Sequence, residues 1–392
     1  MKNIAVLTYH SVIDHNQKRN WSFLSTSVKA FESTLKYLKK KGYKSISLQE
    51  LYDLKTENTD IDDSKYIIIN FDDGFLDNYT IVFPLLEKYG FKATVYVSPD
   101  FVDPRPIVRT TMYDKIINGE DVPLETCWGY MSWEELKLID RSGIIDVQAH
   151  AMTHTWYATG PELVDIHHAG DKYFWLWWNS FKELKPFWLT KYNENDVKFG
   201  TPVFQFEKSI VAKRFFVNDE VNKFIMDKYR ERKISNDSER RKFVLDLNNQ
   251  IKEKFADGIG RFETDEEYYQ RLVDEIQTSK KIIEERLDKQ VRFLAWPGGG
   301  NNTLAQQIAR DAGFYSVTKK GKAYNELTDA PFYFYRVGGW SGIKIMNKPC
   351  LIIERLFIMM QLYRSKGDKY LLNRLFSLIG NVHRYRNINI KR

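Results

Sequence analysis

The segment Tyr66-Ile67-Ile68-Ile69-Asn70-Phe71-Asp72-Asp73-Gly74 is an apolar run that ends in two adjacent carboxylates and a glycine. From Tyr66 to Phe71 it has the length and the β-branched content of a buried strand. Helical stretches separate it from other short runs of this kind. These runs are Ile4–Tyr9, Lys44–Leu48, Ala93–Ser98, Ile144–Ala149, Val291–Trp296, Tyr315–Thr318 and Phe332–Val337. Such alternation predicts an α/β fold with a largely parallel sheet.

The helices expected between these strands carry signals at their N-termini. Ser27 is placed to cap a helix over Val28–Lys40. Two capping boxes predict further helix starts, because a hydroxyl residue is followed three positions later by a glutamate. They are Ser132 with Glu135, and Thr264 with Glu267 at the start of a long helix to Asp288. Apolar periodicity adds helices at Asn78–Tyr89 and Thr303–Ala312.

The composition excludes several classes of protein. The 392 residues are 43% hydrophobic and 28% charged, which is a globular mixture, so disorder and fibrous architecture are excluded. Two cysteines cannot build a disulfide framework or a cysteine-based zinc cluster. Met1–Asn3 leads directly into the first predicted strand, which leaves no room for a signal peptide. We therefore expect a cytoplasmic protein.

Residues 155–263 interrupt the strand–helix alternation. The segment is rich in aromatic residues and then in charged helical sequence, so it predicts a mainly helical insertion. Its tryptophans include Trp175, Trp177, Trp178 and Trp188. They are interpreted either as the core of the insertion or as the lining of a sugar or lipid site.

Residues 348–392 carry the excess of basic charge. They hold ten basic and two acidic residues, a difference larger than the net charge of +7 for the whole chain. Apolar residues recur there at helical spacing, so residues 346–392 are predicted to form a basic amphipathic helical segment. It either contacts an anionic membrane surface or packs on the core with a solvated basic face. No nucleic-acid partner is expected, because no recognised binding motif accompanies the charge.

Two groups of polar residues stand where predicted strands end. Asp72 and Asp73 follow the strand that ends at Phe71, and His150 and His154 follow the strand that ends at Ala149. An Asp-Asp-Gly sequence alone is often only a turn. Parallel α/β folds, however, place their sites at the carboxyl ends of strands. Together these residues supply an Asp-His-His set that can hold a metal and leave coordination positions open.

Four motifs resemble one known family. Asn70–Gly74 and His150–His154 resemble the first two signatures of the polysaccharide deacetylases, the family 4 carbohydrate esterases with a NodB-homology domain. Leu294–Gly299 resembles the third signature. Val6–His10 resembles the opening strand of the branch that acts on poly-β-1,6-N-acetylglucosamine. The resemblance implies a distorted (β/α) barrel of seven to eight strands, with a domain over residues 1–345 that the insertion interrupts.

The resemblance also implies roles for individual residues. Asp73, His150 and His154 would hold a divalent metal, with zinc expected and nickel or cobalt as alternatives. Asp72 would be the general base and His10 the general acid. The metal would share the developing oxyanion with a backbone N–H of the turn, and four residues there would line the substrate site: Trp296, Pro297, Gly298 and Gly299.

The chain departs from the family pattern at two informative positions. Ala151 lacks the hydroxyl that fixes the loop after the first metal histidine, and Ala295 stands where many members carry an arginine that orients the base. Gly338-Gly339-Trp340 is a candidate for the far wall of the site. We assign no role to the histidines without a partner pattern, which are His15, His167, His168 and His383.

The predicted function is a metal-dependent N-deacetylase that removes acetate from an N-acetylated amino sugar, either a glycan or a precursor of a surface polysaccharide. The basic C-terminal segment predicts work at the inner face of the cytoplasmic membrane. Two alternatives remain open. One is a non-catalytic glycan- or lipid-binding protein on the same fold, and the other is an amidohydrolase that cleaves a different C–N bond.

Overall fold

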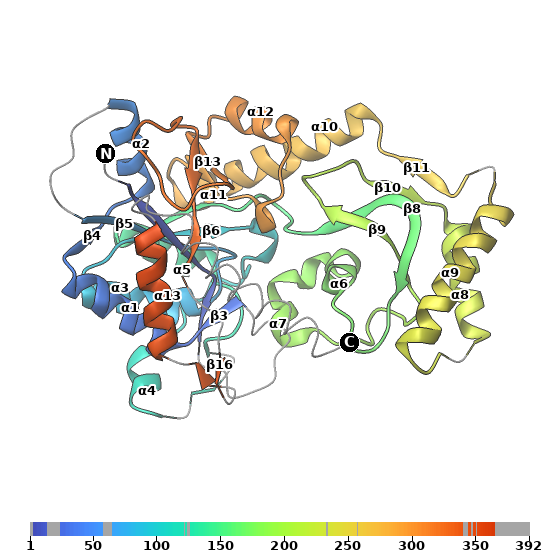
Figure 1. The fold of residues 1–392 in the computed structure, drawn as a ribbon, viewed down its shortest axis with the longest axis horizontal. Helices are drawn as coiled ribbons and strands as arrows, with labels where there is room; N and C mark the ends of the chain where they lie inside the picture. The colour runs from blue at the N-terminus through green and yellow to red at the C-terminus, as the bar shows by residue number, and fades with distance from the viewer. Residues whose placement is uncertain are drawn as a thin grey trace.

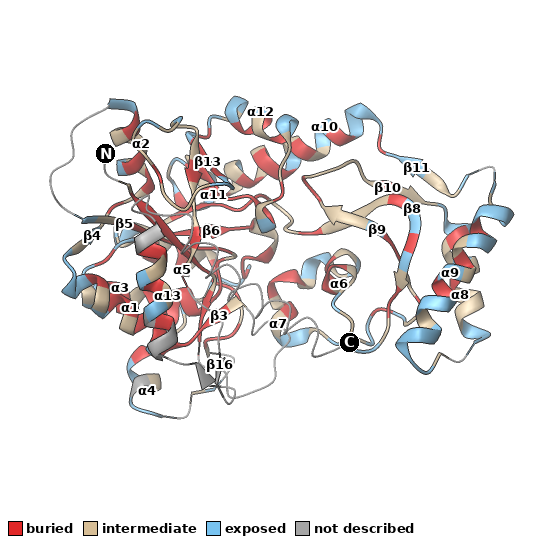
Figure 2. Cartoon of the chain, viewed as in Figure 1, coloured by how far each residue is buried: buried red, intermediate tan, exposed pale blue. Residues whose placement is uncertain are grey.

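The structure is a computed structural model, and it describes residues 3–13, 24–57, 65–120, 122–123, 126–232, 234–256, 258–339, 344–345, 348–349 and 351–364. Figure 1 shows a strand-and-helix barrel on the left and a second part on the right, which residues 156–262 form. The barrel strands are the most buried part of the chain, whereas the outer faces of the helices are exposed (Figure 2).

A parallel sheet forms the barrel. In the described part of the chain its order is β14-β13-β12-β7-β6-β5-β1-β15, and β4 pairs with β5 beside this path. The strands are β1 (Ala5–Tyr9), β4 (Tyr43–Ser45), β5 (Lys65–Phe71), β6 (Ala93–Val97), β7 (Ile145–Ala149), β12 (Phe293–Leu294), β13 (Ser316–Lys319), β14 (Tyr333–Tyr335) and β15 (Val337–Gly338). Only Arg336 separates β14 from β15, so the two ends of the order lie on one stretch of chain. The sheet is therefore nearly closed, which confirms the predicted barrel.

Helices cover the outside of the barrel. They are α1 (Val28–Lys40), α2 (Leu48–Glu57), α3 (Phe83–Tyr89), α4 (Tyr113–Ile117), α5 (Trp133–Arg141), α10 (Asp265–Val273), α11 (Ser279–Leu287) and α12 (Thr303–Asp311). The Ser27 cap and both predicted capping boxes are present. Two of the predicted helices contain a π-helical segment, η2 (Asn78–Val82) before α3 and η6 (Asp274–Thr278) between α10 and α11. Periodicity does not reveal such a local change of winding, but π-segments are frequent at functional sites.

The second part of the structure follows β7 and contains the predicted helices. They are α6 (Phe174–Ser180), η5 (Lys182–Phe187), α7 (Trp188–Lys191), α8 (Asp219–Arg230) and α9 (Asp237–Lys254). It also contains two antiparallel pairs that the sequence analysis misses, β8 (Trp156–Ile166) with β9 (Pro202–Lys208) and β10 (Phe215–Val217) with β11 (Gly260–Phe262). The register of β8 shifts between Ala158 and Leu163, which breaks the alternation expected of a strand.

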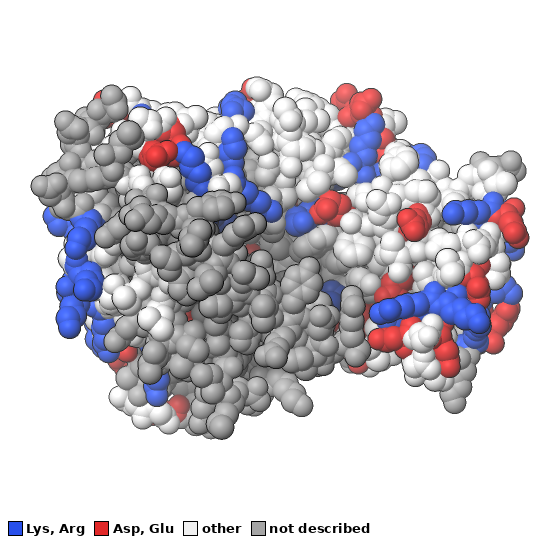
Figure 3. All heavy atoms as spheres, in the orientation of Figure 1, with Lys and Arg blue, Asp and Glu red and all other residues white. Residues whose placement is uncertain are grey.

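The tryptophans of this part pack in an aromatic cluster with phenylalanine and tyrosine side chains. Trp175, Trp177, Trp178 and Trp188 belong to one buried cluster, and that cluster continues into the barrel residues Phe75, Phe101 and Tyr130. Acidic and basic side chains intermingle over α8 and α9 on the face in Figure 3. Those two helices thus present a solvated face of mixed charge.

The C-terminal helix α13 (Leu351–Arg364) lies beside α1. Ile358 and Leu362 are buried in the core cluster, whereas Leu356 and Met359 on the same helix are exposed. This part of the basic segment packs on the barrel, and residues 365–392 lie outside the described residues. No helix in the described ranges has both the length and the apolar character needed to cross a membrane. The remaining described elements are the short strands β2 (Ser11–Val12), β3 (Ser25–Thr26), β16 (Lys344–Ile345) and β17 (Lys348–Pro349) and the short helical turns η3 (Pro99–Phe101) and η7 (Pro297–Gly299).

Candidate metal centre and active site

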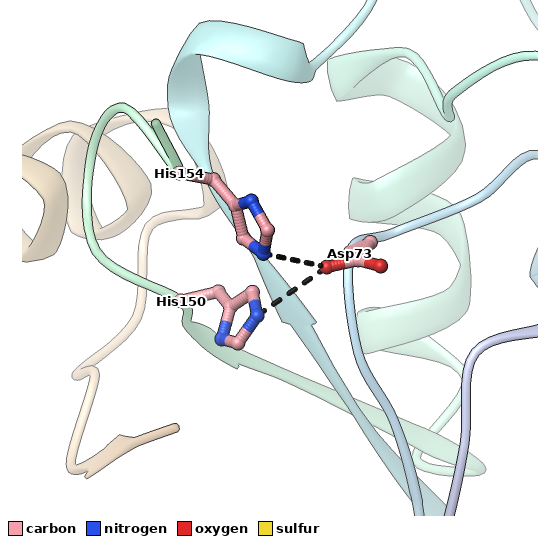
Figure 4. A group of neighbouring side chains, drawn as sticks. All are labelled: Asp73, His150 and His154. Carbon is pink, nitrogen blue, oxygen red and sulfur yellow. Dashed lines mark ion pairs between the residues drawn. The ribbon is translucent and has the colours of Figure 1, made fainter. Parts of the chain in front are cut away.

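Asp73, His150 and His154 meet at the carboxyl end of the barrel strands. Asp73 follows β5, the histidines follow β7, and β6 lies between these two strands. The Nε2 atoms of His150 and His154 each lie 3.3 Å from Oδ1 of Asp73 (Figure 4). The structure thus brings together the three predicted ligands, although Asp73 lies 77 residues before His150 in the sequence.

The donor atoms fit a divalent metal. The three ligand atoms lie within 4.8 Å of one another, and one carboxylate with two imidazoles is a donor set typical of zinc and related ions. Nδ1 of His150 lies 2.7 Å from the carbonyl oxygen of Ala295, so a proton on Nδ1 leaves Nε2 free to ligate. Burial lowers the pKa of His154 to about 4, which keeps that imidazole neutral near pH 7.

The backbone at the ligands is held in an unusual conformation. Asp73 has φ 74°, Ala151 has φ 56° and His154 has φ 43°, and none of them is a glycine. A non-glycine residue in this region costs of the order of 1–3 kcal/mol and persists only where its surroundings enforce it. Three such residues around one group of ligands indicate that the fold maintains this geometry against local preference.

Asp72 points to a different set of partners. Arg336 donates hydrogen bonds from both of its terminal nitrogens, at 2.6 Å to Oδ1 and 2.9 Å to Oδ2 of Asp72. Burial acts to raise the pKa of Asp72, but the charges of Arg336, His150 and His10 outweigh it and hold that pKa below its usual value. Asp72 is therefore ionised and fixed in orientation beside the three ligands.

Sequence reasoning missed Arg336. It noted that Ala295 stands where many members of the resembling family carry an arginine, and in the structure Arg336, between β14 and β15, contacts Asp72 instead. The available signal was the predicted strand Phe332–Val337. An arginine near the carboxyl end of a barrel strand is placed to reach the site.

His10 follows β1 and faces Asp72. Its Nε2 lies 3.8 Å from Oδ2 of Asp72. The amide of Asn78, in η2, donates to the backbone carbonyl of His10 at 2.9 Å, which ties the end of β1 to the segment after Asp73. His10 is thus close to the carboxylate of Asp72 but is not one of the three clustered ligands.

The segment Trp296–Gly299 follows β12 and forms a tight turn. The N–H of Gly299 donates to the carbonyl of Trp296 at 2.8 Å, and Gly298 has φ 55°. A Cβ on Gly298 would lie 2.7 Å from Cε of Lys208 in β9, so the second part of the structure covers this turn. The positive φ of Gly298 accordingly favours a glycine at this position of the turn.

An apolar pocket adjoins the ligands. It is lined by Asp73, Phe75, Ser98, Phe101, Tyr130, His154, Trp178 and Trp188. Trp178 and Trp188 come from α6 and α7, so the second part of the structure contributes a wall next to the ligands. Both interpretations of its tryptophans therefore have support, because the same side chains build a core and line a pocket.

The other histidines lie apart from this site or outside the described ranges. His167 contacts Asp171 at 2.6 Å and His168 lies 3.8 Å from Asp165, in the second part of the structure. His15, Trp340 and His383 lie outside the described residues. At Gly339 a Cβ would lie 2.1 Å from the ring of Tyr9, so its role is close packing against β1.

Comparisons with known proteins agree with this geometry. Residues 59–167, which include Asp72, Asp73, His150 and His154, match the family model for polysaccharide deacetylase. Residues 59–167 thus belong to the polysaccharide deacetylase family. The chain is 34% identical over 94 residues to the Bacillus subtilis (strain 168) protein named "Putative polysaccharide deacetylase YxkH". The match covers 24% of this chain and 31% of that protein.

A second relative is the poly-β-1,6-N-acetyl-D-glucosamine N-deacetylase of Escherichia coli (strain K12), which is 21% identical over 152 residues. That match covers 39% of this chain and 20% of the enzyme. This chain therefore matches less than a third of the length of either curated relative.

Two solved structures share the fold. A de-N-acetylase from Aggregatibacter actinomycetemcomitans has a TM-score of 0.52 at 18% identity, covering 86% of this chain and 94% of that one. The BpsB deacetylase domain from Bordetella bronchiseptica has a TM-score of 0.50 at 18% identity, covering 85% of this chain and 94% of the domain. At 18% identity these two similarities show a shared fold and nothing more.

Proposed function

We propose that this protein is a metal-dependent N-deacetylase that hydrolyses the acetamide of an N-acetylated amino sugar to a free amine and acetate. The proposal rests on one observation. The adjacent carboxylates of Asp72 and Asp73 face different partners. Asp73 faces two imidazole nitrogens, whereas Asp72 faces Arg336 and His10. One carboxylate is thus placed to ligate a metal while its neighbour remains available for proton transfer.

We propose that Asp73, His150 and His154 hold one divalent ion, with zinc as the expected metal and nickel or cobalt as alternatives. When bound, such an ion supplies Lewis acidity that activates water and polarises a carbonyl group. The donor set and the spacing of its atoms support this assignment. The family membership supports hydrolysis of a C–N bond.

In this proposal Asp72 accepts the proton of the water that attacks the amide carbon. Arg336 keeps the carboxylate ionised and prevents its rotation, because both oxygens accept a hydrogen bond from the same guanidinium. Since the C–N bond then breaks, the leaving nitrogen requires a proton. His10 is placed to donate it, because its Nε2 lies on the Asp72 side of the site.

The turn after β12 is proposed to bind the developing oxyanion. Gly299 uses its N–H within the turn, so we assign the oxyanion contact to the N–H of Gly298. We propose that the apolar pocket next to Asp73 and His154 receives the methyl group of the acetyl group. We also propose that Trp296, Pro297 and Gly299 line the substrate site.

The test is acetate release from a panel of N-acetylated substrates: nucleotide-linked sugars, lipid-linked sugars and oligosaccharides. We expect metal-dependent acetate release from at least one member, and none with the Asp72→Asn variant. If wild-type protein binds metal but releases acetate from no member, the binding-protein alternative gains support. Release of another acid from a different amide would instead support the second alternative.

We also propose that the chain works at the inner face of the cytoplasmic membrane through its basic C-terminal segment. Seven of the ten basic residues of the segment follow Arg364 and support an electrostatic contact with an anionic surface, while Ile358 and Leu362 of α13 are already used by the core. Sedimentation with anionic vesicles should be strong for the full chain and weak for a chain that ends at Arg364. This truncation keeps the packing of α13 on α1, so equal sedimentation of the two proteins would count against membrane attachment.

A further inference from the structure

The loop that carries His150 and His154 is held from two sides by buried charged residues. The sheet fixes the first residue of the loop. The N–H of His150 donates to the carbonyl oxygen of Val97 at 2.8 Å, and the hydroxyl of Ser98 donates to the carbonyl oxygen of His150 at 2.8 Å. Ala151 and His154 nevertheless adopt positive φ values of 56° and 43°. Further contacts are needed to hold the residues between them in that conformation.

Glu275 holds the N–H side of the loop. One of its carboxylate oxygens accepts hydrogen bonds from the backbone N–H of Met152 at 3.2 Å and of Thr153 at 3.0 Å. Its other oxygen accepts a hydrogen bond from the hydroxyl of Thr153. Glu275 is 2% exposed and lies in the π-helical segment η6. Ala151 has no hydroxyl group that could hold the loop. The carboxylate of Glu275 provides such fixed contacts instead.

Lys185 holds the carbonyl side of the loop. Its ammonium donates to the carbonyl oxygen of Thr153 at 3.0 Å and to Asp100 at 2.8 Å. The N–H of Asp100 in turn donates to the carbonyl of Met152 at 3.3 Å. Lys185 is 2% exposed and comes from η5, within the insertion.

We propose that Glu275 and Lys185 are positioning residues that set the metal affinity of the Asp73, His150 and His154 site, an inference that rests on the metal site of the proposed function. The peptide groups of Met152 and Thr153 lie between an anion and a cation. His154 follows Thr153 directly, so displacement of that peptide moves its Nε2 away from Asp73. The insertion is therefore part of the structure that holds the metal ligands.

The test measures metal affinity directly. Wild-type protein, Glu275→Ala and Lys185→Met are stripped of metal and titrated with Zn²⁺ against a chromophoric chelator, and with Co²⁺ followed by its visible absorption. We expect the Kd of each variant to rise about 10- to 100-fold, as is typical when a contact that orients a metal ligand is lost. The Co²⁺ bands should also change in position or intensity, which a loss of stability alone would not produce.

Two control variants remove the same charges from a buried glutamate and a partly buried lysine outside the loop. Glu263→Ala removes a buried glutamate that binds Arg271 and the N–H of Arg214. Lys289→Met removes a lysine that holds Asp140 and Asp146, and Asp146 lies at the far end of β7 from His150. We expect the Kd of both controls to stay within about threefold of wild type, a range well below the loss expected for the positioning residues.

Each outcome discriminates. Wild-type metal affinity in folded Glu275→Ala and Lys185→Met overturns the inference, and so does an equal loss in the controls. Where the alanine variant does not fold, Glu275→Gln takes its place. It keeps one carbonyl oxygen for the two N–H donors, so we expect a smaller loss with the same sign, and an unchanged Kd again overturns the inference. Failure of the wild-type protein to bind metal would instead contradict the proposed function.

Discussion

Arg336 donates hydrogen bonds to both carboxylate oxygens of Asp72 across 264 residues of sequence. The seam where the barrel closes therefore supports the group that we propose as the general base. Substitution of the arginine should raise the pKa of Asp72, because the largest contribution that opposes burial is then lost.

Arg336→Met should lower kcat/KM near pH 7 by about 10- to 100-fold and move the acid limb of its pH profile to higher pH. Arg336→Lys should have an intermediate effect, because lysine keeps the charge and loses the two-pronged contact. The measurement is kcat/KM from pH 5 to 9 with metal content determined for each protein. An acid limb that stays in place in metal-loaded Arg336→Met would contradict the assignment.

Asp72 and Asp73 should respond oppositely to the same substitution. Asp73→Asn removes a ligand and should weaken metal binding strongly, as should His150→Ala. Asp72→Asn should leave the metal Kd near wild type while turnover falls by about 10²- to 10⁴-fold. Equilibrium dialysis and acetate release, measured on the same samples, separate the two effects. Full acetate release by Asp72→Asn would exclude Asp72 as the base.

His10→Ala should lower kcat by about 10²- to 10⁴-fold and leave the metal Kd unchanged, because His10 is close to Asp72 but is not a proposed ligand. The loss should be smaller with an amide whose leaving amine is weakly basic, since that amine needs less protonation as it departs. A turnover number equal to wild type would assign the acid role to another residue.

Gly74→Ala should damage both stability and the site. Gly74 has φ 69°, and its Cβ would lie 2.7 Å from Cγ1 of Val97. Gly90 is the matched control, because it has φ 73° and nothing within 4 Å of an added Cβ. We expect urea unfolding to show a loss of about 1 kcal/mol for Gly90→Ala, and about 1–3 kcal/mol more for Gly74→Ala. Only Gly74→Ala should weaken metal binding, since Asp73 precedes it.

Asp77→Asn should remove a pH dependence of stability. Burial raises the pKa of Asp77 to about 7, even though Ser11 and the N–H of Val12 donate to its carboxyl group. Between about pH 4 and 7 the folded chain keeps a proton that the unfolded chain releases. The free energy of unfolding therefore falls as pH rises through this range.

In Asp77→Asn that contribution should be absent, so the variant should gain stability relative to wild type from pH 4 to pH 8. The gain is at most about 4 kcal/mol, from about three pKa units. Urea unfolding of both proteins at several pH values measures it. Parallel stability curves for the two proteins would show that Asp77 ionises normally.

Local sequence predicted the largely parallel α/β sheet and the Asp-His-His group because both depend on short-range patterns, whereas the barrel was expected from the family resemblance. Apolar runs mark β5 and β7, and their carboxyl ends place Asp73 beside the two histidines. Capping boxes mark helix starts because the capping contacts join residues only three apart.

Other features depend on contacts that no local pattern encodes. The partnership of Arg336 with Asp72 depends on where the barrel closes. Glu275 is placed by a π-segment inside a helix whose periodicity looks regular, and β8 was missed because its register shifts. Long-range closure, helix winding and a bulged strand are settled by packing rather than by propensity.

The close attachment of the insertion to the metal loop has a consequence for how such proteins diversify. β8 begins two residues after His154, and Lys185 returns from the same segment to Thr153. The segment also supplies Trp178 and Trp188 to the pocket. In the proposed function, exchange of this segment for one that accepts another substrate would also alter the support of His154, a proposed metal ligand. Substrate range and metal affinity would therefore evolve together.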